Sequence, residues 1–273
     1  MTRKQHLLDH PVSFLAHVTG VLDQNLPIPD GNHIDSPASS AVLFLIGPSP
    51  VSGAPRLILN KRSRQVRQPG DLCFPGGGPA PRADRVWARL LSLPGLPVSR
   101  WQAGRKDRQR GNRQLIAQLL ATSLRESFEE MRLMPFGVRF LGPLPPQRLV
   151  LYKRVIYPMV GWVKKQKRFR LNGEVEKLIH IPIEQLLDPD NYACFRITYP
   201  PDIDINIDQQ GRDLPCFVHQ QDGRCDILWG ATYRMVMTFL AQVFDFIPPA
   251  TRARPRMDSH LSPAYFEPPA RSA

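Results

Sequence analysis

The sequence lacks a long apolar run and has few acidic residues for its size. Its longest uninterrupted apolar stretch is Ala41 to Ile46, far short of the ~18 residues that a membrane-spanning helix needs. Polar residues and a proline at positions 9–11 come soon after the first basic residues and interrupt any apolar run there, so we expect no secretory leader. These features predict a cytoplasmic protein with no membrane partner.

Cysteine is also scarce. The chain has four cysteines, none in a CxxC pair and none with paired histidines at ligand spacing; they are Cys73, Cys194, Cys216 and Cys225. This excludes a disulfide framework and argues against a zinc site. We expect reduced thiols, with a Cys216–Cys225 disulfide as the open alternative.

The shortage of acids leaves a strong positive charge. Lys and Arg number 36 against 24 acids, for a net charge of +12, and such a surface attracts nucleotides, nucleic acid or acidic lipid. The excess concentrates in residues 82–113, where Asp84 and Asp107 are the acids among many arginines. Three interpretations stay open for this segment: a lid over a polyanionic substrate, a nucleic-acid contact, or a solvated insertion with a small core of its own.

Hydrophobic periodicity predicts a mixed α/β domain over residues 38–247. Before this domain, residues 1–37 are expected to form a helical lead-in and a loop. After it, residues 248–273 are rich in proline and arginine and are expected to form a disordered tail. The expected strands are 41–46, 56–62, 150–156, 159–164 and 177–181, and the expected helices are 114–131 and 235–244.

The sharpest chemical feature is a trio of carboxylates on the helix predicted over 114–131. Glu126, Glu129 and Glu130 stand at i, i+3 and i+4, so they share one face and repel one another. A hard cation such as Mg²⁺ or Mn²⁺ would relieve that repulsion, and Arg125 could orient a carboxylate. The alternative is an ordinary solvated face. We expect two apolar side chains of the same segment, Leu124 and Phe128, to point the opposite way, into the core.

A glycine run precedes this helix. Gly76, Gly77 and Gly78 would let backbone amides approach phosphate oxygens closely, although a triple glycine alone is more often a turn. Together, the glycine run and the Arg125–Glu130 segment resemble the Nudix box, whose usual form is G-x5-E-x7-REUxEExGU. Upstream, residues 59–77 resemble the signature of the coenzyme A pyrophosphatase branch of that family, as does the later Ile227–Thr232 segment.

The sequence departs from the box at three points. Gly77 and Arg125 are 48 positions apart, so about 34 residues are inserted inside the motif, including most of the basic stretch. The first box glutamate has no clear counterpart, and Asp84 is the nearest substitute. Arg132 stands where a glycine normally ends the box helix. The loop before the glycine run is also one residue shorter than the branch signature.

The resemblance implies an α/β/α sandwich with a mixed sheet and metal-dependent hydrolysis of a nucleoside diphosphate derivative. It implies Glu126, Glu129 and Glu130 as metal ligands for Mg²⁺ or Mn²⁺, with Arg125 supporting them. A later carboxylate would act as base, and the candidates are Glu174 and Glu176.

Substrate contacts are expected at Gly76 and Gly77 and at two arginines, Arg62 and Arg67, that flank the glycine run and could hold phosphates. Trp229 and Tyr233 either stack on a base or pack the last helix on the sheet. Three functions stay open: a coenzyme A pyrophosphatase, a Nudix hydrolase of another nucleotide (a dinucleotide, a sugar nucleotide or capped RNA), and a catalytically weak protein that binds nucleotides or RNA.

Overall fold

The computed structural model describes most of the chain. The described residues are 3–25, 36, 38–102, 110–149, 154–164, 166, 168–198, 212–251, 254–262 and 265–266. Parts of the expected lead-in loop, of the strand predicted from residue 150 and of the segments 82–113 and 248–273 therefore lie outside the described residues.

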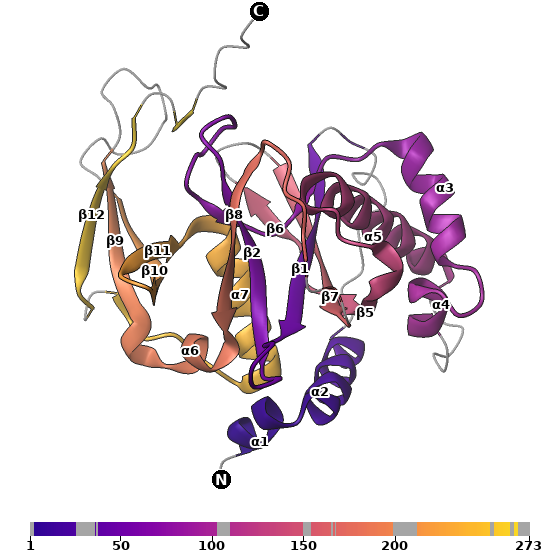
Figure 1. Cartoon of the computed structure of the whole chain (residues 1–273), viewed down its shortest axis with the longest axis horizontal. Coiled ribbons are helices and arrows are strands. Elements are labelled where there is room, and N and C mark those ends of the chain that lie inside the picture. Colours follow the sequence, from indigo (N-terminus) through magenta and orange to yellow (C-terminus); the bar gives the residue numbers. More distant parts are fainter. Residues whose placement is uncertain are drawn as a thin grey trace, which may run out of the picture.

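An eight-stranded mixed sheet forms the centre of the molecule (Figure 1). Its order is β3-β2-β1-β7-β5, with β4 paired to β1, β6 to β7 and β8 to β2. The strands are β1 (Ser39–Pro48), β2 (Pro55–Arg62), β3 (Leu72–Cys73), β4 (Gly76–Gly77), β5 (Val138–Pro143), β6 (Gln147–Leu149), β7 (Arg154–Val163) and β8 (Val175–Pro182). The sheet is mixed because β1 runs parallel to β7 and antiparallel to β2.

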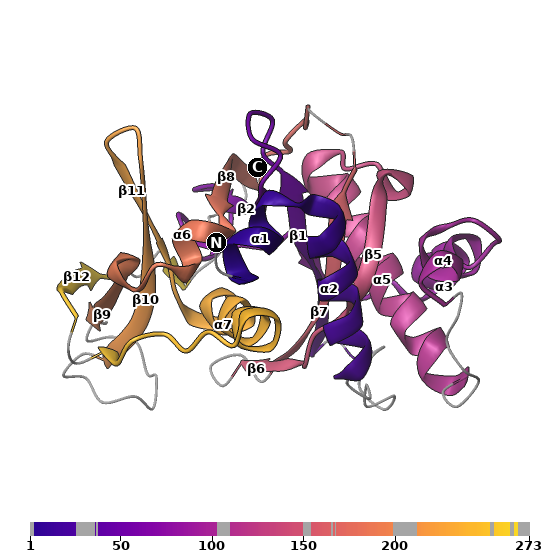
Figure 2. The same cartoon turned by 90° about the horizontal axis from the view of Figure 1, so that it is seen from below.

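Helices cover both faces of this sheet. They are α1 (Arg3–Asp9), α2 (Pro11–Gln24), α3 (Pro81–Leu91), α4 (Pro97–Gln102), α5 (Arg110–Met131), α6 (Ile183–Leu187) and α7 (Gly230–Phe244). Figure 2 shows α7 and α5 on opposite sides of β1. The predicted α/β/α sandwich is therefore confirmed. Among the described helices, none is both long enough and apolar enough to cross a bilayer.

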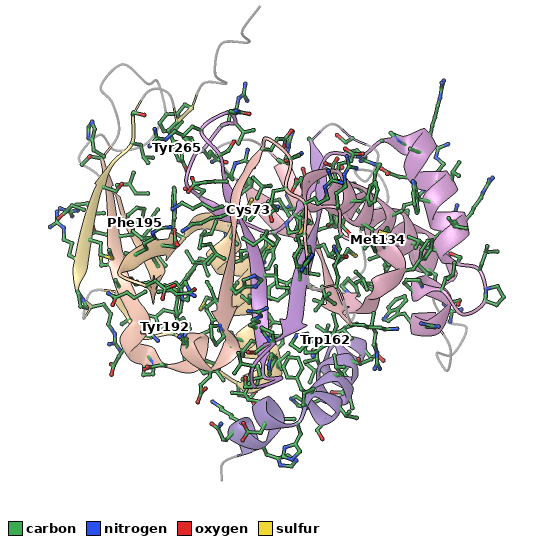
Figure 3. The ribbon with its side chains drawn as sticks, in the orientation of Figure 1. Cys73, Met134, Trp162, Tyr192, Phe195 and Tyr265 are labelled. Atoms are coloured by element: carbon green, nitrogen blue, oxygen red, sulfur yellow. The ribbon has the colours of Figure 1, made fainter. Side chains whose placement is uncertain are left out.

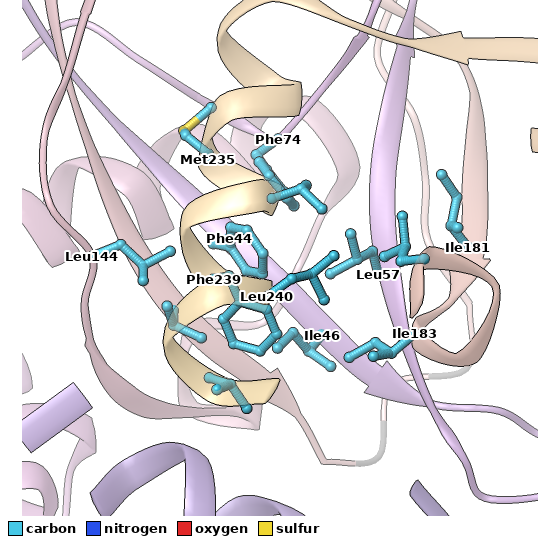
Figure 4. Close-up of a cluster of buried hydrophobic side chains, with 14 of the residues drawn as sticks. Phe44, Ile46, Leu57, Phe74, Leu144, Ile181, Ile183, Met235, Phe239 and Leu240 are labelled. Atoms are coloured by element: carbon cyan, nitrogen blue, oxygen red, sulfur yellow. The ribbon is translucent and has the colours of Figure 1, made fainter. Parts of the chain in front are cut away.

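The apolar run in β1 explains the two layers. Successive side chains of a strand point to opposite faces, so Phe44 joins the core under α2 and α7, whereas Leu43 and Leu45 join the core under α5. Phe44 is fully buried, with its ring centroid 4.3 Å from Phe74 and 4.9 Å from Phe239 (Figure 4). A strand buried on both faces needs the unbroken apolar run that the sequence shows.

A smaller sheet flanks the main one. Its strands are β9 (Tyr192–Thr198), β10 (Arg212–Gln221), β11 (Arg224–Leu228) and β12 (Arg256–His260), in the order β11-β10-β9-β12. Asp226 of β11 forms ion pairs with Lys61 of β2 at 2.7 Å and with Lys177 of β8 at 3.3 Å. This buried carboxylate thus connects the two sheets.

The C-terminal segment differs from the expected disorder where it is described. β12 pairs in parallel with β9, and Leu261 and Tyr265 are buried in a third core cluster. Composition misled the prediction because backbone pairing to an existing sheet edge needs few apolar side chains. The short α3 and α4 helices of the basic segment also pack on α5 and β5, through Ala88, Leu91 and Trp101.

The structure decides several local expectations. The predicted strand over 159–164 belongs to a single longer strand, β7, and the four cysteines are free thiols. The expectation for Phe128 was wrong: its side chain is 36% exposed, and the Arg132 guanidinium lies 4.9 Å from its ring centroid. The core positions near it are taken by Leu124 and Met131 instead.

Candidate active site

The candidate site lies where the last two turns of α5 meet the glycine strand β4. Helix α5 packs along β1 and β4 through buried leucines such as Leu120 and Leu124, which places Arg125 and the box glutamates at the end of the sheet where β4 pairs with β1. The helix ends at Met131, and Arg132 adopts a left-handed φ of 54°. Arg132 therefore has the backbone conformation that a glycine normally supplies, at a cost of about 1 kcal/mol.

Arg125 organises the site. Its Nε donates to Asp84 Oδ1 at 2.9 Å, and its Nη2 donates to the Gly78 carbonyl at 3.0 Å. Its Nη1 donates to Glu126 Oε1 at 2.9 Å and to Glu129 Oε1 at 3.2 Å. One guanidinium thus fixes the glycine strand, two box carboxylates and α3 relative to one another.

Asp84 is the partner that makes this arrangement rigid. It is 3% exposed, and besides Arg125 it accepts hydrogen bonds from the Ala80 amide at 2.6 Å and from the Thr122 hydroxyl at 2.8 Å. The sequence named Asp84 as the nearest substitute for the first box glutamate but left its role open. In the structure it holds Arg125 rather than facing the other carboxylates.

Glu130 is the most strongly perturbed carboxylate of the site. Its Oε2 accepts from Asn60 Nδ2 at 2.6 Å, and its Oε1 lies 3.4 Å from the Gly76 amide nitrogen, which donates to it. Burial, together with the negative charges of Glu126 and Glu174, raises the pKa of Glu130 to about 8. Carboxylates from α5 and from the turn directly before β8 therefore face one another closely enough to repel.

Glu126 lies directly against the glycine strand. A Cβ atom on Gly77 would come within 2.5 Å of the Glu126 carboxyl carbon, so a side chain at position 77 would displace this carboxylate. Burial also raises the pKa of Glu126, the Arg125 charge opposes that shift, and Glu129 and Glu174 add to it. Position 77 is a glycine because Glu126 occupies the space of its side chain.

The donor set suits a divalent cation, although no closed ligand cluster is formed. Within the described residues, no group of three or more His, Cys, Asp or Glu side chains is gathered tightly enough to hold a metal ion. Glu129, half exposed, turns toward Arg125 instead of joining Glu130. Burial and, to a lesser extent, mutual repulsion raise the pKa of Glu126 and Glu130. A hard cation relieves such repulsion, so these oxygen donors fit Mg²⁺ or Mn²⁺.

The other predicted site residues divide into two groups. Arg62 is near the carboxylates, since its charge lowers the pKa of Glu130, and its Nε donates to the Arg67 carbonyl at 2.7 Å. Glu174 is exposed in the turn directly before β8, and its charge acts on both Glu126 and Glu130. The Arg67 and Glu176 side chains are exposed, and no contact described in the structure joins either one to the box carboxylates.

Sequence reasoning missed two supporting contacts. The first is Asn60, a buried polar residue of β2 that directly follows the apolar residues 57–59, and its amide holds Glu130. The second is Asp71, which accepts from the Trp229 indole at 3.1 Å and from the hydroxyl of Tyr265. Tyr265 is labelled in Figure 3. The packing role considered for Trp229 is thus the one observed, with its ring centroid 5.4 Å from Phe195. A polar residue at a buried strand position was the available signal for Asn60.

Comparisons with known proteins add to this geometry. No protein-family model matches the chain. A curated protein of Pectobacterium atrosepticum named "Uncharacterized Nudix hydrolase NudL" is 28% identical over 193 residues, which cover 70% of this chain and 77% of that protein. The "Peroxisomal coenzyme A diphosphatase ndx-8" of Caenorhabditis elegans is 29% identical over 150 residues, which cover 52% of this chain and 48% of that protein.

Solved structures give weaker likenesses. A MutT/nudix family protein from Enterococcus faecalis aligns with a TM-score of 0.39 at 9% identity, covering 90% of this chain and 75% of that one. A NUDIX hydrolase from Alicyclobacillus acidocaldarius gives 0.36 at 16% identity, covering 55% and 81%. At these scores the sequence matches, rather than the structural ones, carry the comparison.

Proposed function

The chain is identified as a member of the Nudix hydrolase superfamily, and on that premise we propose that it is a metal-dependent pyrophosphohydrolase of coenzyme A or a related nucleoside diphosphate derivative. Members of this superfamily act on phosphorus anhydrides. The observation that carries the proposal is the convergence of Glu126, Glu130 and Glu174 beside the glycine strand, with Arg125 tied to Asp84 behind them. The name of the nematode relative and the similarity of residues 59–77 to the coenzyme A branch support the substrate class.

The chain's own residues supply binding and positioning. Gly77 leaves room for the Glu126 carboxylate, and the Gly76 amide donates to Glu130. Arg62 brings positive charge to the same place, where it could hold a substrate phosphate. Glu126 and Glu130, with Glu129, would hold Mg²⁺ or Mn²⁺, which when bound neutralises diphosphate charge and lowers the pKa of water. Arg125 fixes the position of Glu126, and such positioning contributes much of the rate in phosphoryl transfer.

We assign the general base to Glu174 rather than Glu176. Two observations support this assignment: Glu174 is exposed to solvent, and its negative charge acts on both Glu126 and Glu130. No contact or charge effect described in the structure relates Glu176 to Glu126 or Glu130. In this assignment Glu174 accepts a proton from the water that attacks phosphorus.

Replacing Glu126 with glutamine tests the proposal. Glu126→Gln keeps the shape of the side chain but removes its charge, so we expect magnesium-dependent turnover to fall at least about a hundredfold with folding retained. Glu184→Gln, at an exposed position of helix α6, is the matched control and should turn over at the parent rate. Product analysis by chromatography measures phosphopantetheine and adenosine 3′,5′-bisphosphate released from coenzyme A. Equal turnover in Glu126→Gln and the parent would remove the catalytic assignment.

A substrate panel separates coenzyme A from the other nucleotides. Hydrolysis of a dinucleotide, a sugar nucleotide or capped RNA without hydrolysis of coenzyme A would transfer the activity to that substrate. Tight nucleotide binding with no turnover on any member of the panel would instead identify a binding protein.

A further inference from the structure

A positively charged recess lies along α3 and α5, away from the carboxylates of the candidate active site. Helix α3 and the first half of α5 run side by side (Figures 1 and 2), and between them is a groove of about 500 Å³. Arg85 and Arg89 of α3 and Arg113 of α5 line it, over a floor that includes Ala88 and Ala117. No aspartate or glutamate is among the described residues that line it. Its volume is within the range of small-molecule sites.

The sequence of α3 produces this charge. Asp84, Ala88 and Leu91 form the buried stripe that packs on α5. Arg85 directly follows Asp84, and Arg89 directly follows Ala88, so both arginines emerge at the edge of this contact. Arg85 and Arg89 stand at i and i+4, where like charges destabilise a helix by about 0.2–0.5 kcal/mol. An anion held between them would offset that repulsion.

The groove and the active site share one face of α5. Gln114 and Gln118 line the groove, and Thr122 and Arg125 continue the same stripe at steps of three or four residues. Asp84, which holds Arg125, precedes the first groove arginine of α3 by one residue. At 1.5 Å per residue, Gln118 lies about 10 Å along the helix from Arg125. The span from a diphosphate at Glu126 to the groove is thus comparable to the length of a nucleotide.

We propose that this arginine-lined groove binds a phosphomonoester of the substrate that is separate from the diphosphate being cleaved, such as a phosphate on the ribose. The inference rests on the proposed function, because it places that diphosphate beside Glu126. Arginine is suited to this role because its guanidinium donates two parallel hydrogen bonds to a phosphate. The apolar floor admits a sugar or base edge between the arginines.

The kinetic test compares substrates with and without the second phosphate. The double variant Arg85→Gln/Arg89→Gln should raise KM for coenzyme A at least tenfold, leave kcat unchanged, and leave KM for 3′-dephospho-coenzyme A within twofold of the parent. The control is Arg82→Gln, an exposed arginine of the same helix that does not line the groove. Equal KM changes for both substrates, or no change beyond the control, would overturn the proposal.

A binding test separates this inference from the proposed function. If the parent hydrolyses neither substrate, calorimetric titration with adenosine 3′,5′-bisphosphate and adenosine 5′-monophosphate still reports on the groove. Tighter binding of the bisphosphate that is lost in the double variant supports the groove assignment. Equal affinities would overturn it, as would binding of a short RNA that depends on these arginines without any preference for the bisphosphate.

Discussion

Removing the charge of Asp84 should destabilise the protein severely, although the residue lies outside the predicted carboxylate trio. Asp84 is 3% exposed and accepts hydrogen bonds from the Ala80 amide, the Thr122 hydroxyl and the Arg125 guanidinium. Asparagine has the same shape, but it has one acceptor oxygen in place of two. In Asp84→Asn, the amide nitrogen must therefore face a donor, and the Arg125 charge loses its buried counter-ion.

The magnitude follows from the burial of the pair. The Arg125 side chain is 14% exposed and that of Asp84 4%, so water screens their attraction little. Removing one partner of a buried ion pair costs about 3–5 kcal/mol, and we expect Asp84→Asn to lower the free energy of unfolding by about that amount. In a domain of this size such a loss lowers Tm by roughly 10 °C.

The measurement is urea unfolding of parent and variant, followed by tryptophan fluorescence. Asp190→Asn provides the control, because Asp190 also pairs with an arginine, at 3.4 Å from Arg254, but its side chain is 88% exposed. Exposed pairs contribute about 0–1 kcal/mol. A double variant with Arg125→Met should lose less than the sum of the single losses. If Asp84→Asn destabilises the protein no more than Asp190→Asn does, the buried-pair reasoning is refuted.

Two further predictions concern the surroundings of the site. Gly77→Ala should displace the Glu126 carboxylate and lower turnover at least about tenfold more than Gly78→Ala, where a Cβ meets nothing within 4 Å; similar turnover in these two variants would contradict the contact. Burial raises the pKa of Asp71 from 3.8 to about 6, so the folded state binds this proton more tightly than the unfolded state, and stability falls as pH rises from about 4 to 6. Because that shift corresponds to up to about 3 kcal/mol, Asp71→Asn should remove a pH dependence of this size from the unfolding free energy, and an unchanged slope would exclude it.

The central layers could be predicted from the sequence because their patterns are local. The apolar run of β1 and the three- and four-residue spacing along α5 each identify an element without knowledge of its neighbours. β12 could not be predicted, because its strand conformation comes from pairing with β9, some sixty residues away in the chain. Such pairing leaves no periodic signal in the segment itself.

The candidate site, too, could be predicted only where its residues follow a local spacing. The spacing of Glu126 and Glu130 reveals a shared helix face, and both side chains do reach the glycine strand. The same spacing places Glu129 with them, yet the structure turns Glu129 toward Arg125. Helical spacing fixes where a Cβ points, but competing partners decide where the carboxylate goes. Asn60, contributed by a different strand, is invisible to such spacing.

The contact between Asp84 and Arg125 explains how the box can tolerate so long an interruption. These residues are far apart in the chain, yet α3 packs alongside α5, so that Asp84 at the start of α3 meets Arg125 near the end of α5. Of the described residues between them, Ala88 and Leu91 of α3 and Trp101 of α4 join the core under α5. Because one buried ion pair fixes the start of α3 against the end of α5, Arg85 and Arg89 can line the groove without displacing Glu126 or Glu130.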